Sequence, residues 1–266
     1  MAGLLRALML VVALGLSSAG ARADAAFDGL LGRYVVKSAD GITRVDYGRW
    51  RASSADRAAL DMFIAGEAKI QPSKMAKAEQ FVYWANLYNA ITLKVVLDAY
   101  PVASIRDIKS SGVWFDPKAY TGPWVGKRVT VEGRELSLDD IEHSILRPTF
   151  GDARVHYAVN CASYGCPNIG LKGWRADTLD ADLDAAARDF VNHARGVSVS
   201  GDGRVTVSSI YNWFKVDFGG TDAGVIAHLK KYAGPELAKA LEKATALAGD
   251  QYDWSLNDTA QVKVKG

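Results

Sequence analysis

The chain has 266 residues, of which 49% are hydrophobic, and it carries 32 basic and 30 acidic side chains. Arg6 and Arg22 lie in a leader segment that we expect to be removed, so the remaining chain has a balanced formal charge. Because a surface that binds nucleic acid needs a basic excess or a basic stripe, no nucleic-acid partner is expected.

The first 23 residues have the pattern of a secretory signal peptide. Arg6 precedes an apolar run over residues 7–16, and "ARA" at residues 21–23 has the small-residue form of a signal-peptidase site. The run is shorter than the about 20 residues that a spanning helix needs. We therefore predict cleavage after Ala23 and a periplasmic or secreted chain of residues 24–266. This chain would be one globular domain without a membrane span.

Helical and hairpin patterns follow in chain order. Apolar residues recur at helical spacing from residue 54 to about residue 70 and again over residues 77–100, where Pro101 ends the helix. Alternation with a turn signal predicts hairpins over residues 127–138 and 197–209. Between them, Ser137 and Asp140 have the spacing of a capping box that opens a further helix.

The stretch "RVHYAVN", residues 154–160, alternates as a strand and ends at Cys161. Its two faces are both largely apolar, which predicts a central strand that is covered on both sides. Further helical patterns occupy residues 178–194, part of 208–218, and residues 223–232 and 235–247. The chain has no internal repeat and no long linker. We therefore predict an α+β single domain with a small mixed β-sheet braced by several helices.

Several side chains in these elements are candidates for a binding site. Asn86 and Asn89 lie among apolar residues of the 77–100 helix, and a buried carboxamide without partners costs about 1–3 kcal/mol. Each of them is therefore expected to bond either the backbone of a loop or a ligand. The aromatic side chains of the loop over residues 103–125, Trp114, Tyr120 and Trp124 among them, either line a cleft or cover the core.

Cys161 and Cys166 are the two cysteines of the chain, and three interpretations remain open for them. In an exported protein they can pair, and closing so short a loop contributes about 2 kcal/mol. A zinc site would need His143 and His156 as further ligands, but the cysteine spacing is loose and the histidines form no recognised pair. Phosphate-loop, dinucleotide and metalloprotease motifs are missing, so we expect no metal and no cofactor.

In the third interpretation Cys161 is a nucleophile. His143 would take and return the proton, and Glu142 or Asn86 would orient the imidazole. His156 is a less convenient base, because an odd separation along a strand places it on the face opposite Cys161. Backbone N–H groups near residues 162 and 163 would hold the oxyanion.

Four stretches together resemble one family, the domain of unknown function 547 family. They are "FVYWANLYNAITLKVVL", "SLDDIEHSILRP", "VHYAVNCASYGCPNI" and "VSSIYNWFKVDFG", followed by "YDWSLN". The resemblance covers about residues 70–257. It implies a secreted or periplasmic bacterial protein of single-domain form, and it implies that both cysteines belong to the family pattern. The resemblance implies no particular activity.

Two functions from different classes follow from these residues. The first is a thiol-dependent acyl hydrolase or transferase that uses Cys161 with His143. The alternative is a non-enzymatic periplasmic binding or assembly domain with a structural Cys161–Cys166 disulfide, whose ligand is a small molecule or a peptide. Further binding contributions are expected from Asn89, Ser163, Cys166, Arg147 and Asp217, although a structural ion pair is the simpler interpretation for the last two.

Overall fold

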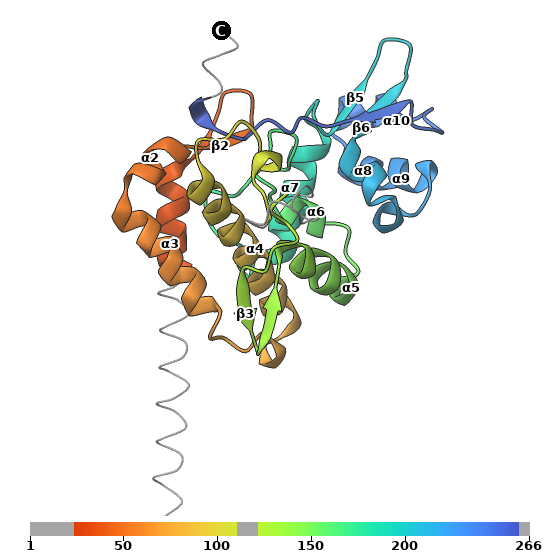
Figure 1. Ribbon diagram of the computed structural model, residues 1–266. Helices are drawn as coiled ribbons and strands as arrows, with labels where there is room; N and C mark the ends of the chain where they lie inside the picture. The colour runs from red at the N-terminus through yellow and green to blue at the C-terminus, as the bar shows by residue number, and fades with distance from the viewer. Residues whose placement is uncertain (1–23, 111–121, 261–266) are drawn as a thin grey trace, which may run out of the picture.

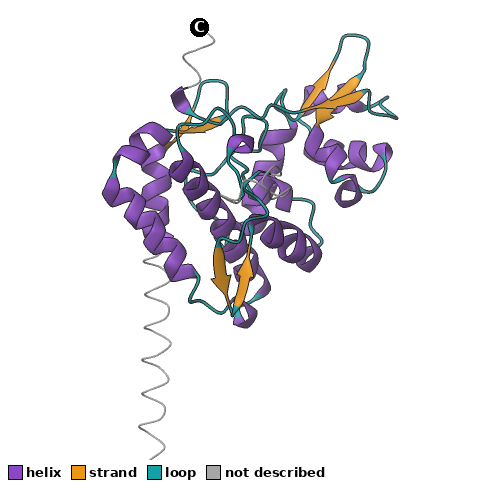
Figure 2. Ribbon diagram, viewed as in Figure 1, coloured by secondary structure: helices purple, strands orange, loops and turns teal. Residues whose placement is uncertain are grey.

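The computed structural model describes residues 24–110 and 122–260. The predicted signal segment, residues 1–23, lies outside the described residues, and so do Trp114 and Tyr120. Helices dominate the described chain, and the strands form small sheets of two or three members (Figures 1 and 2). This arrangement confirms the predicted α+β class. In the described part of the chain, every helix is too short or too polar to cross a membrane.

The first part of the chain surrounds one long buried helix. Residues 24–34 are helical. The elements that follow are β1 (Val35–Lys37), β2 (Thr43–Val45), α2 (Tyr47–Ala52), α3 (Ser54–Glu67), η1 (Pro72–Lys74), α4 (Lys77–Ala99) and η2 (Ile105–Asp107). Strands β1 and β2 pair antiparallel. Helix α4 ends before Pro101 as predicted, because a residue that precedes proline disfavours the helical conformation and Tyr100 is extended.

The second part contains the predicted hairpins and the shorter helices. Its elements are β3 (Val129–Val131), β4 (Arg134–Leu136), the π-helix η4 (Asp140–Leu146), α5 (Arg147–Phe150), α6 (Val155–Ala158), α7 (Leu179–Val191), β5 (Val197–Val199), β6 (Val205–Ser208), α8 (Ser209–Trp213), η5 (Lys215–Phe218), α9 (Asp222–Tyr232), α10 (Pro235–Leu241) and β7 (Gly249–Gln251). Strands β5 and β6 are antiparallel, and β7 joins β6 in parallel, so this small sheet is mixed.

A capping box opens the helical segment that carries Glu142 and His143. The Ser137 hydroxyl accepts from the Asp140 backbone N–H at 3.1 Å, and the Asp140 carboxylate accepts from the Ser137 N–H at 2.7 Å. Two backbone donors are thereby satisfied at the start of the segment. The predicted helix start is confirmed, although the turns that follow are π-helical.

The strand predicted over residues 154–160 is wrong. Residues Val155–Ala158 form one helical turn, α6, and the chain becomes extended at Val159. All four side chains of α6 are at most 3% exposed. The apolar pattern therefore reflects burial on every side and not the two faces of a sheet. Cys161 consequently follows a short helix rather than the end of a strand.

Two hydrophobic clusters meet at the middle of the molecule. The first surrounds α4 and includes Phe27, Trp50 and Leu256, whereas the second includes Tyr157 and the side chains of α7, β5, β6, α8 and α9. In Figure 1, the blue lobe with β5, β6, α8, α9 and α10 stands beside the helices around α4. The segment after β7 returns to the first cluster, where the Asn257 N–H donates to the Ala162 carbonyl at 3.1 Å.

Candidate functional site

A cavity of about 420 Å³ lies where the two clusters meet. We call it the site cavity. Its side chains come from α4, η4, α6, α8, the loop before β3, the loop after α6 and the segment after β7. The polar and aromatic residues that line it are Tyr88, Trp124, Asp139, Glu142, His143, His156, Trp213, Phe214, Tyr252 and Trp254, together with Cys161 and Cys166.

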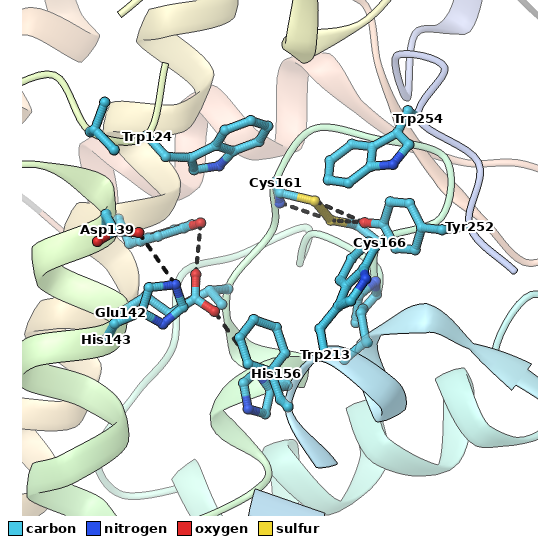
Figure 3. Close-up of a pocket in the computed structure, with 16 residues that line it drawn as sticks. Trp124, Asp139, Glu142, His143, His156, Cys161, Cys166, Trp213, Tyr252 and Trp254 are labelled. Carbon is cyan, nitrogen blue, oxygen red and sulfur yellow. Dashed lines mark hydrogen bonds and ion pairs between the residues drawn. A yellow bond between two sulfur atoms is a disulfide. The ribbon is translucent and has the colours of Figure 1, made fainter. Parts of the chain in front are cut away.

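One side of the site cavity is a continuous group of aromatic rings. Trp213, Tyr252 and Trp254 lie with their ring centroids 4.6–5.5 Å apart, and Trp124 meets Trp254 edge-on at 5.8 Å. These four residues form what we call the aromatic wall. Figure 3 shows Trp213, Tyr252 and Trp254 beside the disulfide and Trp124 across the top of the site cavity. Offset and edge-on contacts at such distances are favourable.

Cys161 and Cys166 form a disulfide that belongs to the same side of the site cavity. The Tyr252 hydroxyl lies 3.0 Å from Sγ of Cys161 and 3.2 Å from Sγ of Cys166, and it also contacts the Ser163 hydroxyl at 2.8 Å. Burial raises the pKa of Tyr252, so its hydroxyl stays protonated. The disulfide agrees with the structural alternative, and it leaves Cys161 without the free thiol that the nucleophile interpretation needs.

The opposite side of the site cavity is a chain of carboxylates and imidazoles. Tyr88 donates to Oε2 of Glu142 at 3.1 Å, and Oε1 of Glu142 lies 3.8 Å from Nδ1 of His156. Nε2 of His156 lies 2.7 Å from Oδ2 of Asp217, and the same oxygen accepts from Nε of Arg147 at 2.6 Å. The His156 hydrogen bond, supported by the Arg147 guanidinium, holds the pKa of Asp217 well below its ordinary range.

His143 faces other partners than those predicted for it. Its Nε2 lies 3.5 Å from Asp139, and Arg147 donates to its Nδ1 at 3.2 Å. Figure 3 shows His143 on the side of the site cavity opposite the disulfide, pointing toward Asp139. Glu142 bonds Tyr88 and lies beside His156, so it does not orient the His143 imidazole. The predicted Cys161–His143–Glu142 arrangement is therefore not assembled here.

The side chains of Asn86 and Asn89, both on α4, hold loops. Asn86 accepts from the Trp174 N–H at 2.8 Å and donates to the Trp174 carbonyl at 3.1 Å. Asn89 accepts from the Asn160 N–H at 2.8 Å and donates to the Ala158 carbonyl at 2.9 Å. Asn86 therefore does not orient His143, and Asn89 fixes the backbone that leads to Cys161.

The remaining predicted positions surround the site cavity. Ser163 is buried behind Tyr252, and Arg147 pairs with Asp217 behind His156. The predicted oxyanion donor at Ala162 already donates to Asn160 at 2.8 Å. Within residues 24–110 and 122–260, no three carboxylate, imidazole or thiol groups converge as metal ligands would.

The segment after β7 contributes Tyr252 and Trp254 to the site cavity, and neither residue is among the predicted site residues. Tyr252 and Trp254 belong to the aromatic stretch "YDWSLN", whose composition is visible in the sequence. Their position against Cys161 depends on contacts of high sequence separation, such as the Tyr252–Cys161 contact across 91 residues. Tyr88 and Trp213 also belong to the site cavity without having been predicted there.

Comparison with known proteins gives one match. Residues 72–191 match the model of a family described as "Protein of unknown function, DUF547". The matched region contains α4, Glu142, His143, His156 and both cysteines, whereas Trp213, Tyr252 and Trp254 lie after it. No curated protein and no solved structure matches the chain.

Proposed function

We infer a function from the site itself, because residues 72–191 belong to the DUF547 family and that family's description assigns no activity. We propose that the chain is an exported, non-enzymatic domain that binds a small molecule in the site cavity. The observation that carries this proposal is the aromatic wall lying opposite the buried carboxylate of Glu142. Ligand sites are typically concave, mostly apolar and aromatic, and contain a few polar groups that fix the ligand's orientation.

Export is supported by two independent observations. The first 23 residues have the charge, apolar run and small-residue site of a secretory signal. The disulfide Cys161–Cys166 is a bond that persists in oxidising compartments and is rare in a reducing cytosol. In this proposal the disulfide is structural and keeps the loop between its two cysteines fixed as part of the cavity wall.

A thermal-stability screen tests the binding function. We would purify the exported, oxidised chain and measure its melting temperature with a set of small amines, sugars and aromatic acids. We expect at least one compound to raise the melting temperature of the wild type, because a ligand that binds only the folded state stabilises it.

Two variants test whether the stabilising compound binds in the site cavity. Trp254→Ala removes one ring of the aromatic wall and is expected to abolish the ligand's stabilisation. Met62→Ala changes an exposed side chain outside the site cavity and is expected to leave it unchanged. The binding proposal is wrong if no compound stabilises the wild type, or if Trp254→Ala keeps the full effect.

Thiol-dependent acyl chemistry is the second candidate function, and one observation favours it: Cys161 and His143 line the same cavity. It requires a reductant to open the disulfide and a movement of His143 away from Asp139 and Arg147. Hydrolysis of p-nitrophenyl acetate by reduced and oxidised protein tests it, with Cys161→Ser as the control. A Cys161-dependent burst in the reduced protein would support this candidate, and identical traces for all samples would remove it.

A further inference from the structure

Glu142 has unused hydrogen-bonding capacity at the surface of the site cavity. Its side chain is 11% exposed, and among the described residues its one hydrogen bond comes from the Tyr88 hydroxyl. Burial and the nearby Glu142 charge raise the pKa of Tyr88 well above its ordinary value, so Tyr88 stays a donor. A carboxylate has about four lone-pair sites, and a buried charge is costly unless donors satisfy it. Further donors are therefore favoured on the cavity side of Glu142.

The contacts of His156 leave Oε1 of Glu142 without a hydrogen bond among the described residues. Nε2 of His156 lies 2.7 Å from the Asp217 carboxylate and donates to it. Nδ1 of His156 lies 3.8 Å from Oε1 of Glu142, beyond hydrogen-bond distance. Oε1 of Glu142 can therefore accept from a donor that enters the site cavity.

The surroundings favour a donor that is also positively charged. The carboxylates and imidazoles that line the described part of the site cavity belong to Asp139, Glu142, His143 and His156, and no lysine or arginine is among the described lining residues. The neighbouring Arg147 is bound to Asp217 at 2.6 Å. Indole and phenol rings of the aromatic wall attract cations through their π faces.

We propose that the site cavity recognises a ligand with an ammonium group, held by the Glu142 carboxylate, whose apolar body packs against the aromatic wall. The inference rests on the proposed function, since it names the ligand class for the same cavity. The ammonium group supplies up to three donors, of which one can bond Oε1 of Glu142 and another can face the Asp139 side of the cavity. A carboxylate ligand would meet Glu142 with like charge and no donor.

Three probes of the same shape test this ligand class. Isothermal titration of the oxidised protein at pH 7 would use benzylamine, benzyl alcohol and benzoate, which share a ring and differ in charge. We expect benzylamine to bind about tenfold more tightly than benzyl alcohol, and benzoate to bind weakest. Glu142→Gln keeps the size of the side chain and is expected to weaken benzylamine binding about tenfold, with benzyl alcohol changed less than about twofold.

The matched control is Glu135→Gln, which changes an exposed glutamate on β4 outside the site cavity and is expected to alter neither affinity. Benzyl alcohol binding by the Glu142→Gln variant shows that its cavity is folded, and the wild-type comparison of the three probes is decisive even if that variant does not fold. Equal affinities for the amine and the alcohol would overturn the ammonium assignment and leave ligand binding in place. Failure of all three probes to bind would also overturn the ammonium assignment, whereas the binding function itself falls only if no compound of the thermal-stability screen stabilises the wild type.

Discussion

Asp217 accepts a hydrogen bond from His156 at 2.7 Å, and this contact joins η5 to α6 across 61 residues of sequence. His156 also stacks on Phe214 with ring centroids 4.3 Å apart and an interplanar angle of 18°. Because His156 borders the site cavity while Asp217 lies behind it, the pair fixes the imidazole's orientation toward Glu142. The connection between the two parts of the fold and the shape of the cavity therefore depend on the same carboxylate.

Replacing Asp217 with asparagine is expected to destabilise the protein in a pH-dependent way. The variant keeps the size of the side chain but removes the charge that pairs with Arg147 and His156, at a cost of about 2 kcal/mol in unfolding free energy at pH 7. The folded-state pKa of Asp217 is lowered, so its stabilisation is present above the unfolded value near 3.8 and is lost as the pH falls through the folded value.

Urea unfolding at pH 7, 4 and 3 measures this effect. The difference between wild type and Asp217→Asn is expected to shrink toward pH 3, whereas Asp177→Asn, at an exposed position, is expected to match the wild type throughout. A difference that stays constant from pH 7 to pH 3 would show that the Asp217 charge does not carry the stabilisation.

The two histidines of the site cavity are expected to differ in their structural importance. His156 is 3% exposed and bonded to Asp217, so His156→Gln is expected to cost about 2–3 kcal/mol in unfolding free energy. The His143 side chain is 32% exposed, and His143→Gln is expected to stay within about 0.5 kcal/mol of the wild type. Denaturant unfolding of both variants at pH 7 checks this order, and equal losses would contradict it.

The local elements could be predicted from the sequence because their signals are local. Ser137 and Asp140 lie three residues apart, and Pro101 stops α4 directly. The strand predicted over residues 154–160 is wrong because Val155–Ala158 form a single helical turn that is buried on every side. Such a turn has no exposed polar residues whose spacing could distinguish a helix from a strand. The candidate site was only partly accessible, since Cys161 meets Tyr252 across 91 residues and no periodic pattern reports such a contact.

The roles of the two histidines likewise could not be predicted from local sequence patterns. The predicted strand over residues 154–160, which is wrong, would place His156 on the face opposite Cys161 and therefore favours His143 as the base. In the structure both line the site cavity, and the hydrogen bond from Nε2 to Asp217 sets the role of His156. The sequence contains both partners of this bond, but their pairing depends on how η5 packs against α6.

Removing the disulfide is expected to lower stability moderately. The bond closes a loop with a sequence separation of 5, and loops of this length contribute about 2 kcal/mol in the chain-entropy model. The double variant Cys161→Ser, Cys166→Ser is therefore expected to lose about this much unfolding free energy relative to the oxidised wild type. Guanidinium unfolding with and without a phosphine reductant measures it. Reductant is expected to affect the wild type and not the double variant, and an equal response of both would contradict the prediction.

Asn89→Ala is expected to be the more damaging of two asparagine substitutions. It removes both bonds to the loop before Cys161 and leaves the buried Asn160 N–H without its acceptor, at a cost of about 2 kcal/mol. The Ala158 carbonyl still accepts from the Trp174 indole N–H at 3.0 Å. Asn212 is exposed, and Asn212→Ala is expected to cost less than about 1 kcal/mol. Thermal unfolding followed by circular dichroism compares the two, and a similar melting temperature for both would show that Asn89 does not hold the loop.

A crystal structure of the oxidised protein soaked with benzylamine would show directly whether Glu142 holds an ammonium group in the site cavity. We expect density in the site cavity, with the amine nitrogen within hydrogen-bond distance of the Glu142 carboxylate and the ring against the aromatic wall. An empty cavity at a saturating benzylamine concentration, or an amine bound elsewhere on the molecule, would contradict it.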